Sequence, residues 1–332
     1  MKPNVLRALS EVFYPISRES GIKQLIDLGI LNKETAGCLA EFLSDGMYSY
    51  RKMYEMLAPV KVRLDEWMRV ADYSKFRPTQ SLASIKRYAQ ASPSYFSVDG
   101  LRGSHVLDFG AGQYSPLSIA ILLYINGAET VTAFEPAGWF PDTTPVSIRE
   151  LISDIHVQPD TYNFAGHNDA RLLKRRLAEL SFEAINQDEI NLGPIRLCKH
   201  LDFQSYASSF DMILSTSVFE HVSSFDNEIQ NHLTSLRPGG ISINRVDFTD
   251  HRQWKPELVP FGFYRDGVPC GCNLLRVSDL ADAAKKTGAM FEIKDCVLAD
   301  SNTIDEEHLV DRFRGYTLTT LRTMAATLVL AK

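Results

Sequence analysis

The chain has 332 residues, of which 45% are hydrophobic and 23% are charged, and its formal net charge is −6. This length and composition are enough for a full hydrophobic core and exclude a disordered or fibrous chain. The excess of 41 acidic over 35 basic residues argues against a nucleic-acid partner, which needs a basic face. No apolar stretch reaches the about 20 residues of a membrane span, and residues 1–15 lack the apolar core of a signal peptide. We therefore expect a cytoplasmic protein with no membrane partner.

Residues 1–98 are expected to form a helical N-terminal cap. Apolar residues recur at helical spacing from Leu6 to about Tyr95, with almost no strand-like alternation. The segment Ala91–Ser104 is rich in Ser, Gly and Pro, which predicts a linker and a domain boundary near residue 98. The cap helices also offer a surface through which copies of the chain could form a homo-oligomer.

Residues 99–332 alternate between strand-like and helix-like runs. The strand-like runs are "HVLDF", "TVTAFEP", "IRLCKHLDF", "FDMILSTS", "GISINRVDF", "MFEIKDCVLA" and "TLVLAK". This alternation predicts an α/β fold with a Rossmann-like, doubly wound, mostly parallel sheet and an antiparallel C-terminal strand. The interval between "FEP" and "IRLCKH" is too long for one crossover helix, so we expect a helical insertion over about 140–195 that could act as a lid.

The stretch "VLDFGAGQYSP" ends the first strand with an acid and two glycines. Gly110 and Gly112 carry no Cβ, so they allow a sharp turn and a close approach to a ligand. A dinucleotide-binding turn has a third glycine, where this chain has Ser115. Asp108 would repel a pyrophosphate but suits a cationic ligand such as S-adenosylmethionine, which carries an ammonium and a sulfonium.

Four further motifs follow in order: "VTAFEP", "HLDF", "FDMILSTSVFEHV" and "LRPGG". Together with "VLDFGAG" they resemble the motifs of class I S-adenosylmethionine-dependent methyltransferases. The resemblance implies that Glu135 accepts hydrogen bonds from the ribose hydroxyls and that Asp202 contacts the adenine amine. The cofactor residues expected from it are Asp108, Gly110, Gly112, Glu135, Asp202, Phe203 and Ser215.

A narrower similarity concerns the order of "STSVFEHV", "LRPGG", "VDFTDH" and "NLLR". This order resembles a bacterial group of methyltransferases associated with polysaccharide and small-molecule pathways. The chain departs from that group's pattern at Phe219, Phe248 and Leu274. The resemblance implies a small-molecule acceptor. A sugar hydroxyl is the first candidate for the group that accepts the methyl.

The acceptor end is expected just past the carboxyl ends of the central strands. An alcohol is a poor nucleophile and gains about 10² to 10⁴ in rate from a positioned base, whereas an amine needs only to be neutral. We expect His251 to be that base, with Asp250 beside it. His221 is the second candidate, although its position favours a structural role, fixing the turn after the strand, over catalysis. As an alternative, Asp247 and Asp250 could hold Mg²⁺ with His251.

Two further segments bear on the acceptor end. In "NLLR", Asn273 and Arg276 either contact the acceptor or lock their loop onto the sheet. The "CGC" run at Cys270–Cys272 lacks the second ligand pair of a typical zinc site, so we expect incidental thiols there.

The sequence thus predicts a methyltransferase that uses S-adenosylmethionine to methylate an oxygen of a small molecule. Three alternatives stay open: an N-methyltransferase, a dinucleotide-dependent oxidoreductase, and a non-catalytic cofactor-binding subunit.

Overall fold

The computed structural model describes residues 78–140, 144–182, 189–251, 260–268 and 272–332, together with Lys23 and Asp27. Almost all of them belong to one compact unit, formed by Arg77–Asp250 and Leu258–Lys332. Residues 1–77 of the predicted helical cap, apart from Lys23 and Asp27, lie outside the described residues. The expected contact between copies through these helices therefore lies outside them as well. His251 directly follows Asp250, where the first part of this unit ends.

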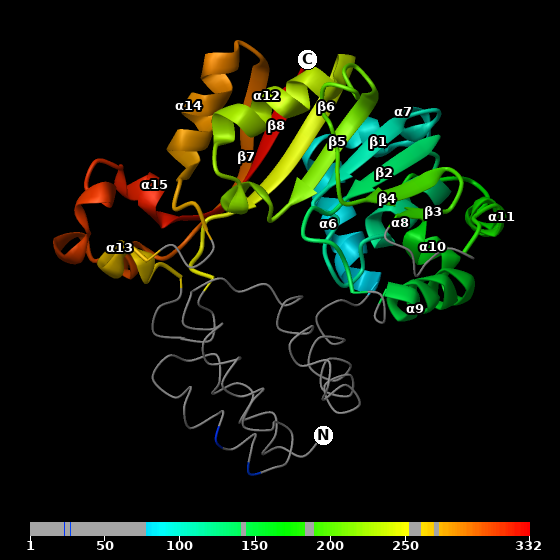
Figure 1. Cartoon of the computed structure of the whole chain (residues 1–332), viewed down its shortest axis with the longest axis horizontal. Helices are drawn as coiled ribbons and strands as arrows, with labels where there is room; N and C mark the ends of the chain where they lie inside the picture. The colour runs from blue at the N-terminus through cyan, green and yellow to red at the C-terminus, as the bar shows by residue number, and fades with distance from the viewer. Residues whose placement is uncertain are drawn as a thin grey trace. The chain divides into compact units, whose positions relative to one another are not determined.

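The described part of the chain forms an eight-stranded sheet in the order β3-β4-β2-β1-β5-β6-β8-β7 (Figure 1). The strands are β1 (His105–Phe109), β2 (Thr130–Phe134), β3 (Ile190–Asn191), β4 (Ile195–Cys198), β5 (Phe210–Thr216), β6 (Leu236–Asp247), β7 (Met290–Leu298) and β8 (Thr323–Ala331). Neighbours among β4, β2, β1, β5 and β6 pair in parallel, and β8 runs antiparallel to both β6 and β7. The predicted mostly parallel sheet with an antiparallel C-terminal strand is confirmed. Only the short antiparallel strand β3 was not expected from the sequence.

Helices cover both faces of this sheet. The α-helices are α6 (Pro78–Ala91), α7 (Val98–Leu101), α8 (Ser118–Ile125), α9 (Thr144–Val157), α10 (Pro159–Tyr162), α11 (Arg171–Ala178), α12 (Phe225–Ser235), α13 (Phe263–Asp266), α14 (Val277–Thr287) and α15 (Leu318–Arg322). The 3₁₀ turns are η2 (Pro93–Phe96), η3 (Phe219–His221), η5 (Ser301–Thr303), η6 (Glu306–His308) and η7 (Asp311–Phe313). One core packs α6, α8 and α9 together, whereas a second core packs α12 and α14 on β6 and β8 (Figure 1). Among the described helices none is long and apolar enough to cross a membrane.

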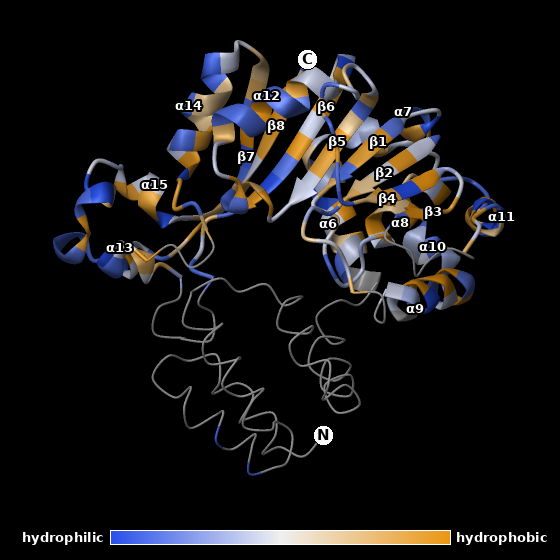
Figure 2. Cartoon of the chain, in the orientation of Figure 1, coloured by the Kyte–Doolittle hydropathy of each residue, from blue (hydrophilic) through white to orange (hydrophobic). Residues whose placement is uncertain are grey.

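The central strands are largely buried. Figure 2 shows many hydrophobic residues along them. Successive side chains of a strand point to opposite faces, so one strand can contribute side chains to two hydrophobic cores. On β6, Ile243 joins the core of α6 and α8, and Val246 joins the core of α12 and α14. The paired strand β8 divides in the same way, with Val329 in the first core and Leu328 in the second. The sheet therefore holds both helical layers in place and leaves its carboxyl edge for the site.

The predicted linker Ala91–Ser104 is wrong. This segment instead contains the end of α6, η2 and α7, with Phe96 and Leu101 buried in the main core. The compact unit accordingly begins at Arg77, ahead of the predicted boundary at residue 98. A composition rich in Ser, Gly and Pro does not by itself identify a linker, because short turns of this composition can still bury their few apolar residues.

The predicted insertion consists of α9, α10, α11 and β3 in its described parts, 144–182 and 189–195. Its helices bury apolar side chains in the same core as α8: Ile148, Leu151, Ile155, Leu173 and Leu177. This shared core indicates a fixed layer of the fold. This packing favours a fixed layer over the lid expected from the sequence, and hydrogen exchange tests the choice.

Candidate cofactor and acceptor site

The glycine turn joins the carboxyl ends of β1 and β2. The amides of Gly110 and Ala111 both donate to the carbonyl of Phe134, at 2.8 and 3.0 Å. Gly110 and Gly112 have φ angles of 76° and 88°, in the left-handed region that favours glycine. A Cβ on Gly110 would lie 2.2 Å from Cγ2 of Val218, whereas the space beside Gly112 is open. Gly110 therefore makes room for Val218, and only Gly112 leaves open space of the kind expected for a ligand.

Two buried carboxylates flank this turn. Asp108 is 2% exposed, and its Oδ2 has no hydrogen-bond partner among the described residues. Burial, and next the charge of Glu135, raises the pKa of Asp108 to about 8. Glu135 accepts hydrogen bonds from the amides of Gly112 and Ala137, at 2.8 and 3.1 Å, but burial still raises its pKa. A cation nearby offsets the cost of burying a carboxylate, so the turn favours a positively charged ligand.

Tyr88 is a residue of this region that the sequence analysis did not single out. It lies on α6, is fully buried, and its hydroxyl is 2.6 Å from Oγ1 of Thr216 at the end of β5. Burial and then the charge of Asp108 raise the pKa of Tyr88 well above its usual range. Only the helical spacing of α6 was visible in the sequence, and it does not tell which face reaches the sheet.

The other predicted cofactor residues occupy different environments. Asp202 is exposed and accepts hydrogen bonds from Oγ of Ser205 and the amide of Gln204, which lower its pKa. The half-buried ring of Phe203 lies 5.9 Å from the ring of Phe109, between centroids. Ser215, in contrast, is fully buried, and its hydroxyl donates to the side chain of Asn244 at 2.8 Å. Against expectation, the Ser215 hydroxyl serves the interior of the sheet.

The turn η3 after β5 carries the least expected residue, Glu220. It is 2% exposed, and neither of its carboxylate oxygens has a well-formed hydrogen bond in the part of the chain that the structure describes. Burial raises the pKa of Glu220 to about 8. Backbone contacts lower this pKa in part, and the charge of Asp247 raises it further. The motif "FEHV" contains Glu220 beside His221, but the sequence does not show that the acid turns inward.

Asn273 locks its loop onto η3. Its Nδ2 donates to the carbonyls of Phe219 and Val222, at 2.7 and 3.0 Å, and its amide donates to the carbonyl of Glu220 at 2.7 Å. Of the two roles left open for Asn273, these bonds support the structural one. They also hold the turn of Glu220 against the segment that precedes α14.

Arg276 is buried and structural. Its guanidinium donates to the carbonyls of Phe248 and Thr323, both at 2.7 Å. Its carbon Cζ also lies 5.2 to 5.6 Å from the centroids of four aromatic rings, those of Phe248, Phe261, Phe263 and Tyr264. The expected contact with an acceptor is not supported, because these groups surround the guanidinium inside the protein.

Asp247, the last residue of β6, and Asp250, three residues later, have different surroundings. Asp250 is buried, its Oδ2 accepts from the amide of Phe263 at 2.9 Å, and its own amide donates to Pro260. Asp247 is half-buried and accepts from the amide and hydroxyl of Thr249. Among the described residues, the ligand atoms within 4.8 Å of those of Asp247 and His251 come from Glu220 and not from Asp250, so the predicted pairing of Asp247 with Asp250 around Mg²⁺ is not supported.

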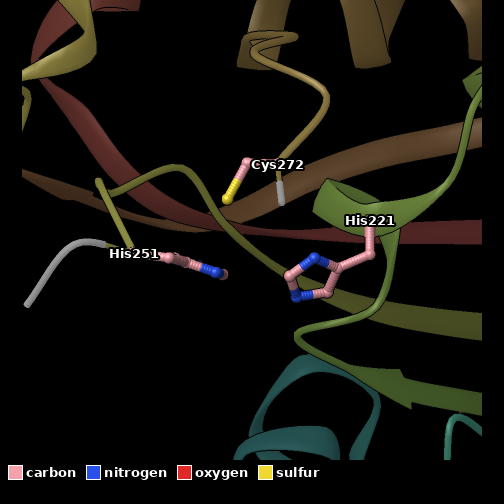
Figure 3. Close-up of side chains that lie close together, drawn as sticks. All are labelled: His221, His251 and Cys272. Atoms are coloured by element: carbon pink, nitrogen blue, oxygen red, sulfur yellow. The ribbon is translucent and has the colours of Figure 1, made fainter. Parts of the chain in front are cut away.

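His251, the residue that follows Asp250, lies where two groups of side chains meet. Ligand atoms of His221, His251 and Cys272 all lie within 4.8 Å of one another, and so do those of Glu220, Asp247 and His251. Figure 3 shows the rings of His221 and His251 turned toward each other with Cys272 beside them. The structure thus brings the two candidate bases, His221 and His251, into one cluster. Cys272, expected to be an incidental thiol, belongs to the same cluster; Cys270 lies outside the described residues.

A known family matches the sequence of this chain. The family described as "Methyltransferase domain" matches residues 73–291, which is more than half of the chain. The chain belongs to this family. It is therefore a methyltransferase, and its sheet and glycine turn resemble those of class I S-adenosylmethionine-dependent enzymes. The narrower likeness to a polysaccharide-pathway group stays a prediction.

Solved structures that resemble this methyltransferase are distant. Phosphoethanolamine N-methyltransferase 2 of Haemonchus contortus, in complex with S-adenosyl-L-methionine, has 15% identity and a TM-score of 0.40, covering 86% of this chain and 60% of that one. A possible histamine N-methyltransferase of Thermotoga maritima has 12% identity and a TM-score of 0.36, covering 84% and 99%. An S-adenosylmethionine-dependent methyltransferase of Mesorhizobium loti has 12% identity and a TM-score of 0.35, covering 70% and 92%. No curated protein matches the sequence.

The residues of the methyltransferase fit its cofactor. The unpartnered Oδ2 of Asp108 suits the cofactor's ammonium, and each carboxylate oxygen of Glu135 retains a lone pair for a ribose hydroxyl. The open space at Gly112 allows the ligand to approach the backbone. When bound, the cofactor supplies an electrophilic methyl group on sulfur. The dinucleotide alternative has no support from the family match.

Proposed function

We propose that this methyltransferase transfers the methyl group of S-adenosylmethionine to a hydroxyl of a small molecule, such as a sugar or a sugar-containing metabolite. The observation that carries the proposal is the cluster of His221, Glu220, Asp247 and His251 at the carboxyl ends of β5 and β6. A hydroxyl must lose its proton as it attacks, whereas a neutral amine needs no such help. A cluster of proton-accepting groups is therefore useful for oxygen and superfluous for a neutral amine.

The position of the cluster relative to the glycine turn supports the same proposal. Val218, two residues before Glu220, lies so close to Gly110 that a Cβ there would meet it at 2.2 Å. Ligands of doubly wound sheets bind at the carboxyl ends of the strands, near β1 and its neighbours. The protein's part in the reaction is then to hold the acceptor in line with the methyl group and to draw off its proton through the cluster centred on His251.

The test is methyl transfer from isotopically labelled S-adenosylmethionine to a panel of sugars, sugar nucleotides and matched amino compounds. We expect labelled product with hydroxyl acceptors, and His251→Ala should lower turnover by about 10² to 10⁴ with cofactor affinity changed only a few fold. His156→Ala is the matched control, because His156 is exposed on α9 and its side chain bonds, among the described residues, to the Ile152 carbonyl of its own helix. Product with amines alone would favour the N-methyltransferase, and cofactor binding without any product would favour the non-catalytic subunit.

A further inference from the structure

We propose that His221, His251 and Cys272 bind one divalent metal ion of the zinc class, with Glu220 and Asp247 next to it. The ion would sit at the acceptor end, separate from the cofactor's contacts at Asp108 and Glu135. The binding of the ion does not depend on the proposed function. The role of the ion in the reaction, described below, rests on that function.

The spacing of the side chains carries the first step. Two imidazoles and a thiol offer ligand atoms within 4.8 Å of one another. With zinc bonds of about 2.0 to 2.3 Å in a tetrahedron, ligand atoms stand roughly 3.3 to 3.8 Å apart. Small rotations of side chains that already face one another, as Figure 3 shows, would reach that spacing.

The kinds of ligand select the metal. Imidazole and thiolate suit zinc and its neighbours, whereas Mg²⁺ prefers oxygen ligands and an octahedral shell. Three protein ligands leave a fourth position for water or a substrate oxygen, as in catalytic zinc sites. The donor set therefore points away from the Mg²⁺ site considered from the sequence.

Glu220 gives an independent reason to expect a cation. A carboxylate that is 2% exposed, with both oxygens lacking a well-formed hydrogen bond among the described residues, is costly unless a positive charge compensates it. Its ligand atom also lies within 4.8 Å of those of Asp247 and His251. His251 thus belongs to both groups, so an ion on its ring would lie near both carboxylates.

The backbone holds these ligands without the metal. The three hydrogen bonds of Asn273 fix the segment after Cys272 to the turn that carries Glu220 and His221. His251 is one peptide bond from Asp250, whose side chain and amide are anchored to Phe263 and Pro260. Ligands fixed in this way lose little freedom on binding an ion, which favours affinity.

In the proposed reaction the ion would act on the acceptor oxygen. A hydroxyl bound at the open position has a lowered pKa. Its oxygen forms a bond to the methyl carbon as the bond from that carbon to sulfur breaks, and the sulfur leaves as a neutral thioether. The hydroxyl proton passes to the carboxylate of Asp247.

The test is Co²⁺ titration of the full-length protein after treatment with a chelator. We expect one equivalent of Co²⁺ to give strong visible bands typical of tetrahedral coordination and a near-ultraviolet thiolate-to-cobalt band, both removed by Zn²⁺. Cys272→Ser should lose the thiolate band, and His221→Gln should weaken Co²⁺ binding at least tenfold. Cys296→Ser is the matched control, because Cys296 is exposed on β7, and it should keep both signals.

Folding and activity are measured on the same samples. Circular dichroism and cofactor affinity identify any variant that fails to fold; for such a variant, Cys272→Ala and His221→Asn take its place. Absence of Co²⁺ binding, or a thiolate band that survives in Cys272→Ser, would overturn the metal site even if hydroxyl methylation is found. Stoichiometric binding with the expected loss in Cys272→Ser would support it even if no hydroxyl acceptor is methylated.

Discussion

The cofactor end and the acceptor end of this methyltransferase are built differently. The cofactor end comes from two neighbouring strands, with one short motif supplying Asp108, Gly110 and Gly112 and the next strand supplying Glu135. The acceptor end gathers Glu220, Asp247, His251 and Cys272 from three separate segments. The first end depends on backbone shape, and the second depends on how loops are anchored to one another. This difference suggests that changes at each end will affect different measurable quantities.

The largest effect is expected for Gly110→Ala. Its Cβ would overlap Val218 at 2.2 Å, in addition to about 1 to 2 kcal/mol of left-handed strain. We expect cofactor binding to be lost in isothermal titration. Gly112→Ala has similar strain but open space, so its loss should be smaller unless the ligand occupies that space. A double variant with Val218→Ala should regain part of the binding; if it regains none, the overlap with Val218 is not the cause.

The next effect concerns Glu135. Glu135→Ala should weaken S-adenosylmethionine binding by about 1.5 to 3 kcal/mol, the range for hydrogen bonds to a charged group. The loss also frees the amides of Gly112 and Ala137, so thermal stability should fall with it. Glu129→Ala, on the loop before β2, serves as the control. An unchanged dissociation constant would remove Glu135 from the cofactor site.

The sequence predicted the cofactor end better than the acceptor end, because the first is built from local motifs and the second from distant segments. The motif "VLDFGAG" and the strand runs are local patterns, and the sheet repeats them in the predicted order. Glu220 and Cys272 could not be predicted, because their place depends on the bonds that Asn273 makes to a segment more than 50 residues away. The structural roles of Arg276 and Asp250 were hidden in the sequence for a related reason. A charged residue after a strand looks the same in the sequence whether it faces a ligand or caps buried backbone groups.

A smaller effect concerns pH and Asp108. The pKa of Asp108 is raised from 3.8 to about 8 in the folded protein, so the folded state holds this proton more tightly than the unfolded state. Its contribution to stability is therefore full below about pH 4 and is lost as the pH rises toward 8. We expect Asp108→Asn to lose that part of the pH dependence of unfolding, measured by denaturant titration without ligand. An identical pH profile for both proteins would contradict the assignment.

Cofactor affinity should follow pH in the opposite direction. The ammonium of the cofactor favours ionised Asp108, so between pH 6 and 7 the affinity should rise up to about tenfold per pH unit. Isothermal titration in buffers of different ionisation enthalpy should report proton release on binding, and Asp108→Asn should abolish it.

The smallest effect is expected in the insertion. The buried residues of α9 and α11 share the main core, so their amide hydrogen exchange should be slow and should change little when cofactor binds. Strong slowing only with both cofactor and acceptor present would show instead that these helices close over the site. Amides of the glycine turn serve as the internal reference, since they should be protected by cofactor alone.

The central claim is that one end binds the cofactor and the other activates the acceptor. It is tested most directly by measuring, for Asp108→Ala and His251→Ala, both the cofactor dissociation constant and the single-turnover rate of methyl transfer at saturating cofactor. We expect Asp108→Ala to raise the dissociation constant and to leave the rate within a few fold. His251→Ala should lower the rate by about 10² to 10⁴ and leave the dissociation constant within a few fold. A His251→Ala protein with normal turnover, or two variants that change both quantities alike, would contradict this division.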